Sequence, residues 1–131
     1  MRFPSDTPWG PMQNFYEFIP SVVIQVTTAG HGGLAIDAKF AQEHLSDTCL
    51  ALGDKWGDAY WFEEDCDMCA PILELLDSAM YSDILFAMYR NTRVDESRDS
   101  LKKTCLKEIC VRTLEHYQPH YIEKYRERKT A

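Results

Sequence analysis

Long apolar runs are absent from this sequence of 131 residues, and no segment approaches the roughly 20 apolar residues that a membrane-spanning helix needs. No signal-peptide pattern follows Met1. The glycine-rich loops that bind nucleotides and the Gly-x-Ser-x-Gly motif of serine hydrolases are also missing. We therefore expect a cytoplasmic protein with no membrane partner, and neither a nucleotide-binding enzyme nor a serine enzyme of a common kind.

Basic side chains are scarce in the first three quarters of the chain. Residues 1–99 contain 6 basic and 17 acidic side chains, residues 100–131 contain 8 basic and 4 acidic ones, and the net charge of the whole chain is −7. From Asp37 to Asp77, eleven acidic side chains accompany only two lysines. A field of this sign repels nucleic acid and attracts basic surfaces or cations. We therefore expect a basic partner and no direct contact with nucleic acid.

Turn residues and hydrophobic spacing indicate the order of strands and helices. Prolines at positions 4, 8 and 11 predict an extended arm, which Trp9 pins to the body of the protein. β-branched and aromatic residues predict strands over 14–19, 21–28, 34–36 and 59–62, with a hairpin turn over 30–33. Helical spacing predicts helices over 37–45, with Asp37 as the N-cap, and over 71–80 and 100–117.

The strands precede most of the helices, and this segregation favours an α+β fold. We expect a single domain over residues 1–131, in which a small antiparallel sheet from the N-terminal half packs against C-terminal helices. Its expected parts are an extended arm (1–14), a β-rich half (15–65) and a helical half (66–131).

The five cysteines are an odd number in a chain without a secretory signal, which favours reduced thiols over a disulfide framework. Cys66 and Cys69 have the spacing of half a zinc site, but there is no second Cys-x-x-Cys to complete it. The surrounding acids would raise the pKa of the thiols and weaken a thioredoxin-like role. We interpret both cysteines as small packed side chains at the start of a helix and expect no cofactor, while zinc at Cys66 and Cys69 stays the alternative.

An acidic run, Glu63-Glu64-Asp65-Cys66-Asp67, follows the last predicted strand. Such carboxylates can act as general acid and base or hold a hard divalent cation, and alternation along a strand would place Glu63 and Asp65 on one face. The same acids also suit the N-terminus of a helix or a solvated rim. His31 lies between glycines that would allow close approach of a ligand, although hairpin tips commonly have this composition.

Three motifs together resemble the pattern of an uncharacterised domain family of small proteins from phages, plasmids and related bacterial mobile elements. They are Thr-Pro-Trp-Gly at 7–10 with Gln13, Thr-Thr-Ala-Gly-His-Gly-Gly at 27–33 with Leu34, and Trp-Phe-Glu-Glu-Asp-Cys-Asp at 61–67. The resemblance covers about residues 6–80. It implies a bacterial cytoplasm that contains mobile DNA, and it implies no activity and no catalytic residue.

These observations lead to three hypotheses. The first is a non-enzymatic, mobile-element-encoded accessory protein that binds and inhibits a host nucleic-acid-handling or defence protein, such as a CRISPR effector or a restriction enzyme. Its binding residues would be Asp58, Glu63, Glu64, Asp65 and Asp67. The second is a small enzyme or metal-binding domain that uses His31 with Glu63 and Asp65. The third is a homodimer formed through exposed tyrosines of the C-terminal helices, namely Tyr117, Tyr121 and Tyr125.

Overall fold

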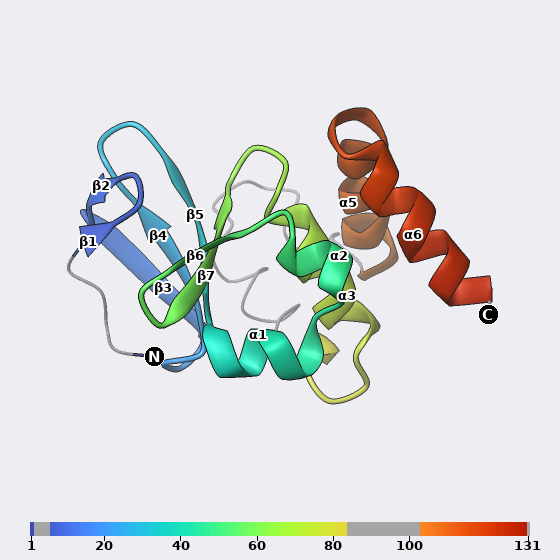
Figure 1. The fold of residues 1–131 in the computed structure, drawn as a ribbon, viewed down its shortest axis with the longest axis horizontal. Helices are drawn as coiled ribbons and strands as arrows, with labels where there is room; N and C mark the ends of the chain where they lie inside the picture. The colour runs from blue at the N-terminus through green and yellow to red at the C-terminus, as the bar shows by residue number, and fades with distance from the viewer. Residues whose placement is uncertain (2–5, 84–102, 131) are drawn as a thin grey trace.

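A computed structural model describes residues 1, 6–83 and 103–130 of the chain. Five strands form one antiparallel sheet in the order β3-β4-β5-β7-β6, with bounds β3 (Asn14–Ile19), β4 (Val23–Thr27), β5 (Gly32–Asp37), β6 (Asp54–Trp56) and β7 (Ala59–Glu63). A separate two-residue pair, β1 (Asp6–Thr7) and β2 (Gly10–Pro11), precedes it. The described helices are α1 (Ala38–His44), α2 (Asp47–Leu50), α3 (Cys69–Asp77), α5 (Lys103–Tyr117) and α6 (Pro119–Thr130). The predicted α+β fold, with its sheet in the N-terminal half, is confirmed (Figure 1).

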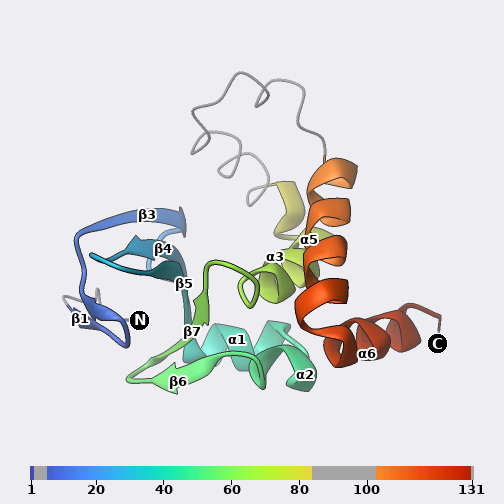
Figure 2. The same cartoon turned by 90° about the horizontal axis from the view of Figure 1, so that it is seen from above.

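The sheet separates two apolar layers, because alternate residues of each strand point to opposite faces. One face contributes Val23, Leu34, Ile36 and Phe62 to a core that also contains buried residues of all five described helices. Figure 2 shows these helices on one side of the sheet, with α5 and α6 farthest from it. The main core of the protein thus lies between the sheet and the helices.

The N-terminal arm covers the opposite face of the sheet. Here the buried residues are Ile24, Val26, Ala35, Ala59 and Trp61, and Met1, Trp9 and Met12 pack against them. Figure 1 shows β1 and β2 of the arm at the end of the molecule away from α6. The prediction that Trp9 pins the arm to the body is therefore confirmed.

The hairpin between β3 and β4 turns at Pro20 and Ser21. The Val22 N–H donates to the Ile19 carbonyl at 2.9 Å, which closes a four-residue turn. Proline favours the second position of such a turn, and the third position requires a positive φ when the turn is of type II. Ser21 has a φ of 62°, a conformation that glycine adopts at lower cost.

The C-terminal helices dock on α3 through two carboxylates. Glu74 accepts hydrogen bonds from the Ser46 N–H at 2.7 Å, the Tyr121 hydroxyl at 2.6 Å and Arg128 at 3.2 Å. Asp77 accepts from the Tyr125 hydroxyl at 2.5 Å and forms ion pairs at 2.9 Å with both Lys107 and Lys129.

Both carboxylates are largely shielded from solvent, because the exposed fraction is 10% for the Glu74 side chain and 15% for the Asp77 side chain. Burial acts to raise the pKa of Asp77, but hydrogen bonds from Tyr125 and the two lysines outweigh it and hold the pKa below its ordinary value. Burial, followed by the charge of Glu74, raises the pKa of Tyr121 far above its ordinary value. Tyr121 is only 2% exposed, so the expectation that it belongs to an exposed tyrosine surface is wrong, although Tyr117 is 59% exposed.

One local prediction differs from the structure, because Gly32 and Gly33 belong to β5 and not to the hairpin turn. The segment 46–57, for which the sequence analysis gives no element, contains α2 and β6. Pro119 begins α6. The predicted start of a helix near residue 100 lies outside the described residues.

Among the residues that the structure describes, no helix is both long and apolar enough to cross a membrane.

Candidate functional site

The three sequence motifs come together at one end of the sheet. Two threonines shape the segments that bring them there. In the arm, the Trp9 N–H donates to Thr7 Oγ1 at 3.0 Å, and this hydroxyl donates to the Gly10 carbonyl at 2.8 Å. Between β4 and β5, the His31 N–H donates to Thr28 Oγ1 at 3.1 Å, and that hydroxyl donates to the His31 carbonyl at 2.8 Å. Each threonine is buried, so these bonds satisfy groups that water does not reach.

The first motif contacts the other two through the indole of Trp9. Its ring lies edge-on against Trp61 of the third motif, with the ring centroids 5.8 Å apart. It also lies over Gly33 of the second motif, where a Cβ would be 2.7 Å from Trp9 Cη2 and 2.0 Å from the Phe62 carbonyl oxygen. Gly33 is therefore a site of close packing between arm and sheet, which explains one glycine of the motif without a ligand.

His31 and Glu63 are brought together by the pairing of β5 with β7. The register places Gly33 opposite Glu63, and His31 Nδ1 lies 3.4 Å from Glu63 Oε1. Both side chains remain accessible, with exposed fractions of 57% for His31 and 42% for Glu63. Two of the three groups of the predicted His31, Glu63 and Asp65 set are thus neighbours.

Asp65 does not complete that set. Its side chain is exposed, and no hydrogen bond or ion pair joins it to another side chain among the described residues. In the same part of the chain, no group of three or more His, Cys, Asp or Glu side chains is arranged to hold a metal ion. The geometry therefore offers a histidine–carboxylate pair and no metal centre within the described residues.

The other acids of the run differ in their surroundings. The Glu64 side chain is exposed and lies against Gly32. A Cβ added to Gly32 would be 2.7 Å from Glu64 Oε2. Asp67 is half-buried and accepts a hydrogen bond at 2.9 Å from Gln118, which lies between α5 and α6, so it ties the loop to the C-terminal helices. Asp58 lies in the turn between β6 and β7, at the end of β7 away from Glu63. The predicted binding set thus contains Glu63, Glu64 and Asp65 near one another, while Asp58 is separate and Asp67 has a structural role.

The two cysteines of the Cys-x-x-Cys motif have different partners. Cys66 Sγ donates to Asp67 Oδ1 at 3.4 Å, and burial, followed by this bond, raises the pKa of its thiol to about 11. Cys69 hydrogen-bonds to Cys110 of α5, which lowers the pKa of Cys69 and raises that of Cys110. This arrangement fits the interpretation of packed thiols and joins α3 to α5.

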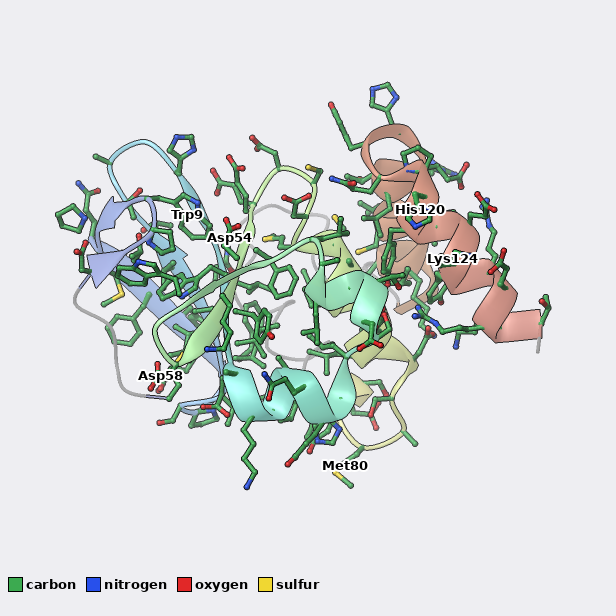
Figure 3. The ribbon with its side chains drawn as sticks, viewed as in Figure 1. Trp9, Asp54, Asp58, Met80, His120 and Lys124 are labelled. Atoms are coloured by element: carbon green, nitrogen blue, oxygen red, sulfur yellow. The ribbon has the colours of Figure 1, made fainter. Side chains whose placement is uncertain are left out.

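Two residues that the sequence analysis did not single out lie beside the acidic run. Asp54 and Trp56 belong to edge strand β6, and the register places them opposite Trp61 and Ala59. Directly paired residues share a face of the sheet, and Glu63 is the diagonal neighbour of Asp54 on that face. We use the name acidic edge for Asp54, Glu63, Glu64 and Asp65. Figure 3 shows Asp54 and Asp58 well apart on the molecule.

A comparison with protein-family models matches residues 2–131 to a domain of unknown function, DUF7007. The chain belongs to this family. Searches of curated proteins and of solved structures found no significant match. The predicted resemblance to an uncharacterised family is confirmed at this level, and the match extends over the C-terminal helices that the three motifs do not include.

The description of DUF7007 names no reaction and no ligand, so the chemistry of the site has to come from its residues. Carboxylates of the acidic edge attract cations and basic side chains. The His31–Glu63 contact places an accessible imidazole beside a carboxylate, which is one part of a proton-transfer site. The acidic edge therefore supports recognition of a basic surface, and the pair with His31 supports at most a fragment of a catalytic site.

Proposed function

We propose that this DUF7007 protein is an acidic binding module, encoded by a bacterial mobile element, that docks on a basic surface of a host nucleic-acid-handling or defence protein and inhibits it. The acidic edge carries the proposal. Its four carboxylates gather near one end of β6 and β7, and no lysine or arginine among the described residues forms an ion pair with any of them. Basic grooves that bind nucleic acid are a target class with complementary charge.

The distribution of neutralised acids supports this choice of surface. Glu74 and Asp77 are also part of the acidic segment of the chain, but cationic side chains of α5 and α6 pair with them. The internal pairing leaves the acidic edge as a solvent-facing group of like charges. Such a group speeds encounter with a basic partner, and its effect weakens as salt increases.

The support beneath the acidic edge is rigid. Asp54 and Glu63 belong to strands whose backbone pairs within the sheet, and the buried Trp61 lies directly opposite Asp54 in this register. A side chain on a paired strand loses less conformational freedom on binding than one on a loose loop. The sheet therefore presents these carboxylates in a preorganised form.

The test is charge reversal at Glu64 and Asp65, whose side chains are exposed and form no described ion pair. The matched control reverses Glu43 and Glu123, which are exposed on α1 and α6 and produce the same change in net charge. Wild type and both double variants serve as bait in a bacterial lysate, and bound proteins are quantified by mass spectrometry. We expect the amount of a captured basic protein to fall at least about tenfold with Glu64→Lys/Asp65→Lys and to be unchanged with the control.

The captured protein is then purified, and its nucleic-acid-dependent activity is measured with each variant. Inhibition by wild type and by the control, but not by the acidic-edge variant, supports the proposal. Equal binding and inhibition by all three proteins would contradict it, because the acidic edge would then contribute nothing specific.

The contact between His31 and Glu63 supports a second candidate, a small enzyme or metal-binding domain. Elemental analysis of the purified protein, compared with His31→Ala, tests it directly. A transition metal at one equivalent that the substitution removes favours this candidate. Metal content that is unchanged in His31→Ala argues against a metal site that includes this imidazole.

A further inference from the structure

We infer that Trp56 is the anchor for an arginine side chain of the partner, with Asp54 as the carboxylate that pairs with the guanidinium. This inference rests on the proposed function and identifies the chemistry of the partner that the acidic edge would bind. It concerns a residue outside all three sequence motifs. The partner is a protein segment that presents arginine, and not a nucleic acid.

Trp56 is an exposed aromatic residue on the edge of the sheet. Its exposed fraction is 44%, and among the strands that the structure describes β6 pairs only with β7. Isolated exposed apolar residues are common on protein surfaces. Tryptophan, however, is among the residues most enriched at the energetic centres of protein interfaces. Its support and its neighbours therefore decide whether it can serve as an anchor.

Trp61 holds both the ring and the backbone of Trp56 in place. Its ring centroid lies 5.7 Å from that of buried Trp61, with the ring planes at 77°. The Trp61 indole N–H donates to the Trp56 carbonyl at 2.9 Å, which fixes the backbone at the same point. Trp61 is itself held by Trp9 from the arm. A side chain that is already ordered in the free protein loses little conformational entropy when it binds.

The neighbours of Trp56 fit a planar cation. Asp54 is two residues away on the same strand and the same face, a spacing of about 6.6 Å between Cα atoms. Its side chain is exposed and forms no described ion pair. Lys55 points to the opposite face and donates to the Gly57 carbonyl at 3.4 Å, so its ammonium group is directed away from Asp54. A guanidinium stacked on the Trp56 ring would thus have a carboxylate within reach.

Arginine matches this arrangement better than lysine. Its guanidinium is planar, stacks on aromatic faces and donates two parallel hydrogen bonds to a carboxylate, whereas the lysine ammonium is a compact and strongly hydrated charge. An exposed tryptophan can also stack on nucleic-acid bases. The carboxylates of the acidic edge and the net charge of −7 oppose a phosphate backbone at this site.

The test uses two fluorescently labelled nonapeptides of identical design, one rich in arginine and one rich in lysine, and measures their affinity for the full chain by anisotropy. We expect tighter binding of the arginine peptide. Trp56→Ala should weaken that binding by about three- to thirtyfold and reduce the preference over lysine, because it removes the stacking surface. Tyr117→Ala is the matched control, because Tyr117 is an exposed aromatic residue on α5. Asp54→Asn should also lower the preference for arginine, and it leaves the three indoles in place should Trp56→Ala fail to fold.

The outcomes separate this inference from the proposed function. Loss of arginine binding in Trp56→Ala and Asp54→Asn, but not in Tyr117→Ala, supports the inference. If Glu64→Lys/Asp65→Lys weakens binding while Trp56→Ala and Asp54→Asn do not, the inference falls and the proposed function stands. If the Trp56 and Asp54 variants weaken binding while the Glu64/Asp65 variant does not, the inference stands and the role of Glu64 and Asp65 falls. Tighter binding of a labelled single-stranded oligonucleotide than of the arginine peptide would overturn the inference.

Discussion

A single methyl group at Gly33 should strongly destabilise the fold. A Cβ there would be 2.0 Å from the Phe62 carbonyl oxygen and 2.7 Å from Trp9 Cη2, both well inside van der Waals contact. The carbonyl belongs to the backbone of the neighbouring strand and cannot rotate away as a side chain would. In Gly33→Ala, β5 and β7 must therefore move apart locally, and Trp9 must leave its position over the sheet.

The expected cost combines two effects. Forcing extra volume into a well-packed region costs about 1–3 kcal/mol. Exposing the indole of Trp9 to water removes roughly 2–3 kcal/mol of stabilisation that came from its buried apolar surface. We therefore expect Gly33→Ala to lower the free energy of unfolding by about 3–6 kcal/mol, a large part of the 5–15 kcal/mol typical of a domain. In a chain of this length, the melting temperature should fall by about 10 °C or more.

Urea unfolding followed by tryptophan fluorescence measures this change, because Trp9 and Trp61 report on the affected contact. Gly30→Ala is the control in the same connection, since no heavy atom lies within 4 Å of its Cβ position and it does not have a left-handed φ. That substitution should change stability by less than about 1 kcal/mol. Trp9→Ala should partly relieve the clash, so the double variant with Gly33→Ala should cost less than the sum of the two changes. Equal urea midpoints for Gly33→Ala and Gly30→Ala would refute the close-packing explanation.

Three further predictions concern the helix-docking network and the first hairpin. Asp77→Asn should destabilise the protein by about 1–2 kcal/mol at pH 7, because it leaves Lys107 and Lys129 without their carboxylate while both remain partly exposed to water. The folded-state pKa of Asp77 is lowered, so this stabilisation is present above about pH 4 and is lost as the pH falls through the folded-state pKa. Chemical unfolding should therefore show a smaller difference in unfolding free energy between wild type and Asp77→Asn at about pH 3 than at about pH 7. Tyr121→Phe should lower the free energy of unfolding by about 1–2 kcal/mol at neutral pH. Because the pKa of Tyr121 is raised in the folded state, urea titrations above about pH 10 should show wild type losing stability more steeply than the variant. Ser21→Gly should stabilise the hairpin by up to about 1 kcal/mol in thermal melts, whereas Ser21→Ala, which keeps the unfavourable positive φ, should not.

The sequence predicts those elements whose signals are local. Strand β3 has the predicted bounds of 14–19, and Asp37 caps α1 by accepting from the Phe40 N–H at 3.1 Å. β-branched and aromatic residues and a capping carboxylate act within a few residues, so no tertiary information is needed to recognise them. The register that brings Glu63 to His31 is a different matter, because it depends on which strands become neighbours.

The errors occur where distant segments decide the conformation. Gly32 and Gly33 have the composition of a turn, but the arm and β7 press against them and hold them in a strand. Tyr121 lies in a polar, charged segment, yet Glu74 from α3 gives its hydroxyl a buried partner. The sequence analysis did not single out Trp56, and its exposure follows from the pairing of β6 with β7 at the sheet edge. In each case, the deciding contact joins residues that are far apart in the sequence.

The uneven charge of the chain has two consequences in the fold. Part of the acidic segment is neutralised internally, because Lys107, Arg128 and Lys129 pair with the carboxylates of α3. The acids near the end of β6 and β7 have no such counterpart among the described residues, so their charge faces solvent. Total net charge therefore overstates how much acid is available to a partner and does not locate it. Reversing charges at the acidic edge should weaken binding with little effect on stability. Asp77→Asn should lower stability with little effect on binding, so measuring both properties in both variants separates the two roles.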